Sequence, residues 1–146
     1  MLSKQLKGNV QFLHSVSSWE EAIKESATPL SKGGNITEKY VDDMIQNVHE
    51  NGPYIVIVPG IAMPHAQNND NSVVKTGVSL LKLEEPVAFP EGKEVNLLFT
   101  LAAEDTTGHL DLISDLSSLL IEDDVQEKLE QSNSEKEILE LIQAVE

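Results

Sequence analysis

Apolar residues recur at helical spacing in two segments of the first third of the chain. The first segment begins at Ser18, which forms a capping-box pattern with Glu21, and it ends at Gly33-Gly34. The second segment begins after Thr37. Its apolar residues fall at positions i, i+3, i+4 and i+7, which are Val41, Met44, Ile45 and Val48. We therefore predict two successive helices, preceded by a short strand at residues 9–13.

The middle of the chain has the pattern of β-strands. Residues 54–58 form a continuous apolar run rich in Ile and Val, which is typical of a strand buried on both faces. Two more strands are expected at residues 76–83 and 95–102. The second of these alternates, and on one side it places Val95, Leu97, Phe99 and Leu101. Two prolines bracket residues 87–89, so this piece is expected to be an edge strand or a loop.

The last third of the chain is expected to be helical. One apolar stripe follows Thr106-Thr107 and contains Leu110, Ile113, Leu116 and Leu120. A short helix is expected after Asp124, and Ser134 with Glu137 forms a second capping box. Because helices precede, separate and follow the strands with only short breaks, we predict an α/β fold in a single domain spanning residues 1–146. The strand order stays open.

The composition narrows the possible functions. The chain of 146 residues has no cysteine, which excludes a disulfide scaffold, a cysteine-ligated metal and a thiol nucleophile. Ten lysines, no arginine and 25 acidic residues give a net charge of −15. Residues 101–146 hold 2 lysines and 13 acids, so −11 of this charge lies in the last third. This charge argues against nucleic acid or anionic membrane as partners and favours a protein with a basic face.

The chain has no apolar run near the roughly 20 residues of a membrane span. Its amino terminus also lacks the apolar core of a secretory signal. We therefore expect a cytoplasmic protein that does not insert into the membrane.

His65 is the first candidate for chemistry, because it follows the most hydrophobic strand. Loops at the carboxyl ends of strands are where α/β proteins place their ligands. Gly60 permits unusual backbone angles, and Pro64 restricts the approach to His65. The small side chain of Ala66 leaves the ring accessible. We expect a positioned and reachable imidazole at this point.

His109 is the second candidate, in the run Thr106-Thr107-Gly108-His109-Leu110 at a predicted helix start. Free N–H groups and the positive end of the helix dipole stabilise an anion there, and they help to keep a nearby imidazole neutral. Sequence spacing alone does not bring His65 and His109 together. His14 and His49 are expected to be ordinary surface or core residues, with His49 exposed in the last turn of the second helix.

Other kinds of site have weaker support. A metal hydrolase using His65, His109 and Asp111 would need ligands at a spacing that is not a recognised one. The nucleophile elbow of serine hydrolases and the glycine-rich loops that bind nucleotides do not occur in the sequence.

The run Gly60-Ile61-Ala62-Met63-Pro64-His65-Ala66, with His109-Leu110 downstream, resembles the EIIA domain of the bacterial sugar phosphotransferase system (PTS). The resemblance is to the fructose–mannitol superfamily, and it covers nearly the whole chain. The run Gly52-Pro53-Tyr54-Ile55-Val56-Ile57-Val58-Pro59-Gly60 is more similar to the ascorbate branch. The mannitol branch carries an arginine at the position of Asn47 and a polar residue at that of Pro59, and this chain has neither.

The resemblance implies a three-layer sandwich with a mixed β-sheet flanked by helices. It also implies that His65 accepts a phosphoryl group from the carrier HPr and that His109 helps to hold this group. The group then passes to a cysteine of the EIIB component, for uptake of a sugar, with ascorbate as the candidate, through the membrane component EIIC. No metal or other cofactor is required. The alternative is a regulatory module of the same fold that reports the phosphorylation state of the system to a regulator.

Overall fold

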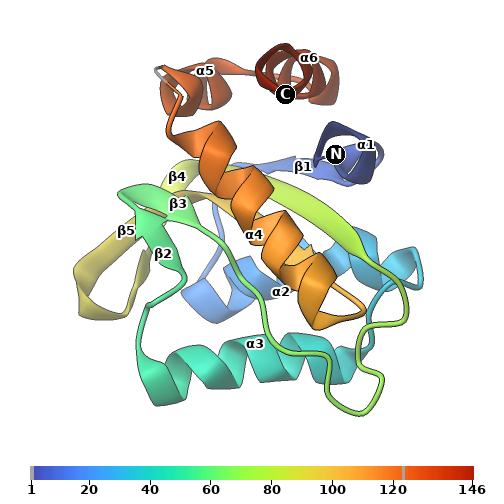
Figure 1. Ribbon diagram of the computed structural model, residues 1–146. Helices are drawn as coiled ribbons and strands as arrows, with labels where there is room; N and C mark the ends of the chain where they lie inside the picture. Colours follow the sequence, from blue (N-terminus) through green and yellow to red (C-terminus); the bar gives the residue numbers. More distant parts are fainter. Residues whose placement is uncertain (1, 123) are drawn as a thin grey trace.

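The computed structural model describes residues 2–122 and 124–146 (Figure 1). The helices are α1 (Leu2–Leu6), α2 (Trp19–Lys32), α3 (Glu38–Asn51), α4 (Thr106–Leu120), α5 (Val125–Gln131) and α6 (Glu135–Val145). The strands are β1 (Val10–Leu13), β2 (Val56–Val58), β3 (Gly60–Ala62), β4 (Gly77–Phe89) and β5 (Lys93–Ala102). A short 3₁₀ turn, Pro90–Gly92, joins β4 to β5.

The strands form one mixed sheet in the order β1-β4-β5-β3-β2. β4 pairs antiparallel with β5 and parallel with β1. β3 pairs parallel with β5 and antiparallel with β2. β5 therefore lies at the centre of the sheet, and its residues from Leu97 to Ala102 are all buried.

Helices cover both faces of this sheet (Figure 1). The core on one face comes from α2 and α3 and includes Ile23, Leu30 and Met44. The core on the other face comes from α1, α4, α5 and α6 and includes Leu6, Leu116 and Ile142. The predicted α/β fold, a three-layer sandwich with a mixed sheet, is confirmed. No helix of the described residues has the length and apolarity that crossing a membrane requires.

Local capping signals set the starts of two helices as predicted. The Ser18 side chain accepts a hydrogen bond from the Glu21 N–H at 3.2 Å, and Ser134 accepts one from the Glu137 N–H at 3.2 Å. Thr37 occupies the N-cap position of α3, but its hydroxyl donates to the Ser72 carbonyl at 3.2 Å instead of capping the helix. The second helix is therefore tied at its start to a distant loop.

The prediction for residues 54–58 was wrong in extent and burial. Only Val56–Val58 is a strand, and it lies at the edge of the sheet, with Val58 exposed. Tyr54 precedes the strand and is 46% exposed. The chain turns at Gly60, whose φ of 91° favours glycine, and enters the unpredicted strand β3. β3 has only three residues, which is too short to show a period.

Three further expectations need correction. Residues 87–89, expected to be an edge strand or a loop, instead continue the long strand β4 and pair with β5 after a register shift between Lys82 and Val87. Val95 packs on the α2–α3 side, opposite Leu97, because the pairing of β3 with β5 is also irregular there. Leu110 is 60% exposed, and the buried face of α4 consists of Leu112, Leu116 and Leu119.

Candidate active site around His65 and His109

His65 lies in the loop that leaves the carboxyl end of β3. Backbone hydrogen bonds hold the two residues before it. The Met63 N–H donates to the Ile55 carbonyl at 2.8 Å, and the Leu101 N–H of β5 donates to the Pro64 carbonyl at 3.0 Å. The approach to His65 is thus anchored both to the central strand of the sheet and to the chain just before β2.

One nitrogen of the His65 ring is already engaged. Nδ1 lies 2.6 Å from the Met63 carbonyl oxygen. Because a carbonyl oxygen only accepts, the proton of a neutral ring is on Nδ1. Nε2, at the other edge of the ring, then carries a lone pair. This arrangement prepares Nε2 to act as a nucleophile.

His109 lies in the first turns of α4, where the chain leaves β5. Asp105 is the N-cap residue, and its carboxylate accepts a hydrogen bond from the Gly108 N–H at 2.7 Å. The ring centroids of His65 and His109 are 5.2 Å apart, with their planes inclined by 53°. The structure therefore brings together the two histidines that sequence spacing could not connect.

Burial and the neighbouring ring affect the charge of His109. Desolvation, and after it the proximity of His65, lower the pKa of His109 below its ordinary value. His109 is therefore neutral near pH 7, and the causes are its burial and the neighbouring His65 ring. Tyr54 packs its edge against His65, with ring centroids 5.8 Å apart, and partial burial raises the pKa of its phenol.

Both histidines line a cavity of about 500 Å³. The other lining residues are almost all polar, and they are Asp43, Gln46, Asn47, Glu50, Asn51, Tyr54, Ala66, Gln67 and Asn69. Five of these residues, at positions 43, 46, 47, 50 and 51, fall on one face of α3. Sequence analysis missed this contribution, because a polar helix face at this spacing has the same pattern as a face exposed to solvent. Asn47, which stands where the mannitol branch has an arginine, lines the cavity.

The sequence and fold both match known proteins. Residues 5–145 match the family model described as the phosphoenolpyruvate-dependent sugar phosphotransferase system, EIIA 2. The chain belongs to this EIIA family. A mannitol-specific cryptic phosphotransferase enzyme IIA component of Escherichia coli K12 is 37% identical over 93% of this chain and 92% of its own length. The ascorbate-specific EIIA component of the same strain is 33% identical over 86% of this chain and 82% of its own length.

One solved relative is a complex. It contains enzyme IIA of the mannitol system of Escherichia coli and phosphorylated enzyme IIB, and this chain matches it with a TM-score of 0.82 and 28% identity. The match covers 94% of this chain and 95% of that chain. The resemblance to the fructose–mannitol superfamily is thereby confirmed. Because relatives of both the mannitol and the ascorbate type match, the branch stays a prediction.

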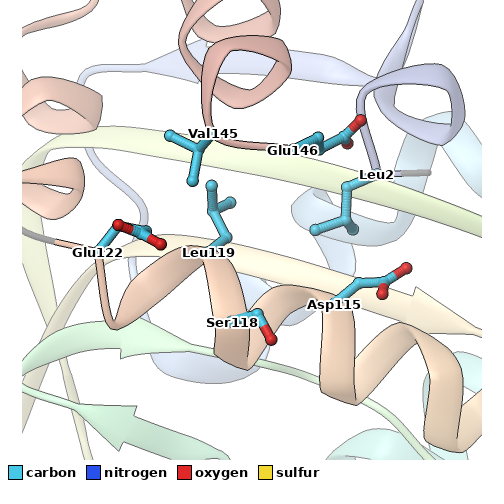
Figure 2. Close-up of a pocket in the computed structure, with 7 residues that line it drawn as sticks. All are labelled: Leu2, Asp115, Ser118, Leu119, Glu122, Val145 and Glu146. Carbon is cyan, nitrogen blue, oxygen red and sulfur yellow. The ribbon is translucent and has the colours of Figure 1, made fainter.

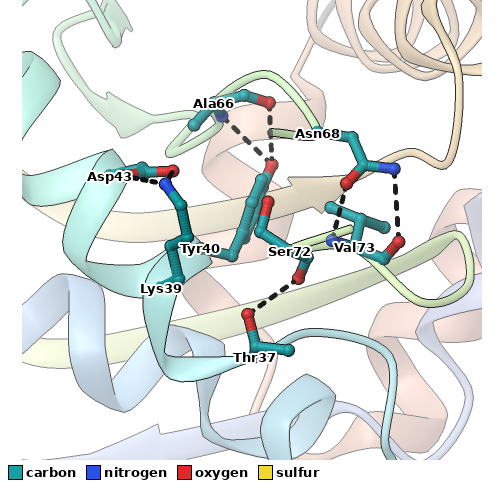
Figure 3. A network of polar contacts seen from close by, with 8 residues as sticks. All are labelled: Thr37, Lys39, Tyr40, Asp43, Ala66, Asn68, Ser72 and Val73. Atoms are coloured by element: carbon teal, nitrogen blue, oxygen red, sulfur yellow. Dashed lines mark hydrogen bonds and ion pairs between the residues drawn. The ribbon is translucent and has the colours of Figure 1, made fainter. Parts of the chain in front are cut away.

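Among the described residues that line the histidine cavity, none is a lysine or an arginine. One lining residue, Asp43, is paired with a lysine, because its carboxylate lies 3.0 Å from Lys39 Nζ (Figure 3). In the described parts of the chain, no three His, Asp or Glu side chains are grouped so that they could hold a metal ion. The metal site considered for His65, His109 and Asp111 therefore gains no support.

A second cavity lies away from the histidines, between α1, α4 and α6 (Figure 2). Its volume is about 270 Å³. Leu2, Leu119 and Val145 give it an apolar part, and Asp115, Glu122 and Glu146 place carboxylates around them. The Glu146 side chain is already occupied, because it accepts hydrogen bonds from the Ser3 N–H and hydroxyl at 2.8 and 3.1 Å. Among the described residues that line this cavity there is no histidine, so we place the candidate active site at His65 and His109.

Proposed function

We propose that the EIIA domain at residues 1–146 accepts a phosphoryl group from phospho-HPr on His65 and passes it to a cysteine of EIIB. The observation that carries this proposal is the hydrogen bond between Nδ1 of His65 and the Met63 carbonyl. It leaves the lone pair of Nε2 available in a ring that lines an open, polar cavity. Membership of the EIIA family supports the same reaction.

The proposed transfer balances without a further reactant. The lone pair of Nε2 forms a bond to phosphorus while the P–N bond of the donor phosphohistidine breaks, and its electron pair returns to the donor nitrogen. Phospho-His65 then carries a positive ring with its proton still on Nδ1. The Met63 carbonyl stabilises that positive charge as it develops. The same steps in the opposite sense release the phosphoryl group to the cysteine thiolate of EIIB.

His109 is proposed to hold the phosphoryl group. As a neutral ring it presents one N–H donor, and its centroid lies 5.2 Å from that of His65. Side-chain amides of Gln46, Asn47 and Gln67 line the same cavity and offer further donors to phosphoryl oxygens. Asp43 and Glu50 oppose this attraction by like charge. A group held between donors and carboxylates is bound loosely, which suits an intermediate that must be passed on.

The partners are proposed from charge and from family membership. The net charge of −15 favours a carrier with a basic docking face, as we propose for HPr, and it accelerates their encounter. EIIB is proposed as the acceptor and EIIC as the indirect membrane partner, and we propose a cytoplasmic location for the protein. Asn47 and Pro59 depart from the mannitol pattern, so ascorbate is the proposed sugar.

The test is phosphoryl transfer from phosphoenolpyruvate through purified Enzyme I and HPr. We expect the intact mass of the wild-type chain to rise by one phosphoryl group, which is lost in acid. Nitrogen NMR of the product is expected to place the phosphorus on Nε2 of His65. If HPr becomes phosphorylated and the chain gains no mass, the transfer function is refuted, and the regulatory function is the one to test next.

A further inference from the structure

We propose that Tyr40 is a positioning residue, which fixes the backbone on the carboxyl side of His65 and thereby the tautomer of its ring. The inference rests on the proposed phosphoryl acceptance at His65. Tyr40 lies in the first turn of α3 and is fully buried. Figure 3 shows its hydroxyl directed at the backbone of Ala66, the residue that follows His65.

The hydroxyl has three partners, and its single proton decides their roles. It accepts a hydrogen bond from the Ala66 N–H at 3.1 Å. It lies 2.5 Å from the Leu101 carbonyl and 3.2 Å from the Ala66 carbonyl. Because a phenol donates one proton, the shorter contact identifies Leu101 as the acceptor. Tyr40 thus connects Ala66 to the central strand β5.

His65 is consequently held from both sides, by different means. On its amino side, the Pro64 carbonyl accepts from the Leu101 N–H, a bond between backbone groups that no substitution of a side chain removes. On its carboxyl side, the contact to Ala66 comes from a side chain. Both bonds lead to Leu101, so the backbone from Pro64 to Ala66 is fixed against one residue of the sheet. Removal of the Tyr40 hydroxyl releases one side only.

The expected consequence concerns the His65 ring. Its Nδ1 reaches the Met63 carbonyl at 2.6 Å only while the backbone of this short segment keeps its shape. If Ala66 shifts, this bond lengthens, and the tautomer with its proton on Nε2 becomes populated. That tautomer has no lone pair on Nε2 for attack on phosphorus. Tyr40 therefore acts on the chemistry through the ring that it orients, without touching the phosphoryl group.

Two further observations suit Tyr40 to this role. Burial raises the pKa of its phenol, so the hydroxyl keeps its proton and remains a donor throughout the physiological range. The same end of α3 holds the loop a second time, because the N–H and the hydroxyl of Thr37 both donate to the Ser72 carbonyl, at 2.9 and 3.2 Å (Figure 3). Two residues at the start of α3, Thr37 and Tyr40, therefore hold the loop that carries His65.

The test compares Tyr40→Phe with Ser79→Ala. Both variants remove a buried hydroxyl that donates to a backbone carbonyl, but the Ser79 hydroxyl donates to Ser26 in α2. In Tyr40→Phe we expect the nitrogen NMR shifts of the His65 ring to change from the single Nδ1–H tautomer to a mixture. Phosphoryl acceptance is expected to slow by about 10-fold or more, since small misplacements of reacting groups carry such costs. Affinity for HPr is expected to stay within about 2-fold of wild type.

Wild-type ring shifts in Tyr40→Phe, or a loss of rate equal to that of Ser79→Ala, would overturn the proposal. Amide exchange in the wild-type chain provides a check that does not depend on the folding of a variant. The Ala66 N–H is expected to exchange slowly although it lies in a loop, and exchange at the rate of a free amide would also overturn the proposal. If the wild-type chain accepts no phosphoryl group, the proposed function fails, while the ring shifts and amide exchange still decide whether Tyr40 positions His65.

Discussion

The four histidines of the chain occupy two contrasting kinds of environment. His65 and His109 line a polar cavity, where one ring faces a backbone carbonyl and the two rings face each other. His14 and His49 lie on the surface beside carboxylates. The rings of His14 and His49 approach Glu84 at 2.9 Å and Glu20 at 3.6 Å, respectively.

The contrast shows how surroundings select the chemistry of an imidazole. A hydrogen bond to Glu84 and the charge of Glu85 raise the pKa of His14, which favours the charged ring. A charged ring has no lone pair for attack on phosphorus. Burial and His65 lower the pKa of His109, so this ring stays neutral. The same residue type is thereby directed to surface ion pairing in one region and to the proposed phosphoryl chemistry in the other.

The largest expected effect separates His65 from His49. His65→Ala removes the proposed nucleophile, so phosphoryl acceptance is expected to fall to background, whereas His49→Ala is expected to behave as wild type. Intact mass after incubation with phosphorylated HPr measures both. Circular dichroism is expected to show both variants folded, because neither side chain belongs to the buried core. Equal phosphorylation of the two variants would mean that the cavity histidine and the surface histidine do not differ in phosphoryl acceptance.

The next effect concerns His109. His109→Ala removes one proposed donor to the phosphoryl oxygens, and the loss of a single donor from an oxyanion hole costs a rate factor of about 10² or more. We expect a slowing of this order, with HPr affinity little changed, measured by rapid-quench kinetics. His14→Ala is the matched control on the surface and is expected to keep the wild-type rate. A wild-type rate in His109→Ala would exclude His109 from the proposed site.

A smaller effect is expected from the residue that joins the two histidine-bearing segments. Asn68 accepts from the Val73 N–H at 2.9 Å and donates to the Val73 carbonyl at 3.2 Å (Figure 3). It also donates to the Glu104 carbonyl at 2.9 Å, just before α4 begins. Asn68→Ala removes these bonds, so we expect the free energy of unfolding to fall by about 1–3 kcal/mol. Urea unfolding measures this loss, with the exposed Asn133→Ala as control. If both variants are equally stable, Asn68 does not hold the loop.

Much of the fold could be predicted because its signals are local. The capping boxes at Ser18 and Ser134 need only the residue three positions later, and both form. In α4 the helix was predicted but its orientation was wrong. Leucines occur on several sides of this helix, so the period alone did not show that Leu110 faces solvent and Leu112 the core.

The sequence singled out the two histidines of the candidate site, but it did not predict that they lie together. The motif around His65 and the helix start at His109 carry local signals of reactivity. The two histidines come together because β3 pairs with β5 and because β5 leads directly into α4. A strand of three residues shows no period, so this pairing could not be predicted from the sequence. The cavity wall from α3 and the Tyr40 contact to Ala66 likewise join distant segments. Such long-range contacts have no period in the sequence.

The smallest expected effect is on titration, and it tests the comparison most directly. In NMR titrations of the ring protons, His109 is expected to titrate below the ordinary value of 6.5 and His14 above it. Because folding lowers the pKa of His109, the unfolded chain binds more protons between the lowered value and 6.5. The contribution of neutral His109 to stability is therefore complete above pH 6.5 and is lost as the pH falls through the lowered pKa. In His109→Ala, the free energy of unfolding is therefore expected to decline less as the pH falls. In His14→Ala, this decline is expected to be unchanged or steeper, because the raised pKa of His14 stabilises the wild-type fold at low pH. If both rings titrate at the same pH, the cavity and the surface do not differ in their effect on the charge of an imidazole.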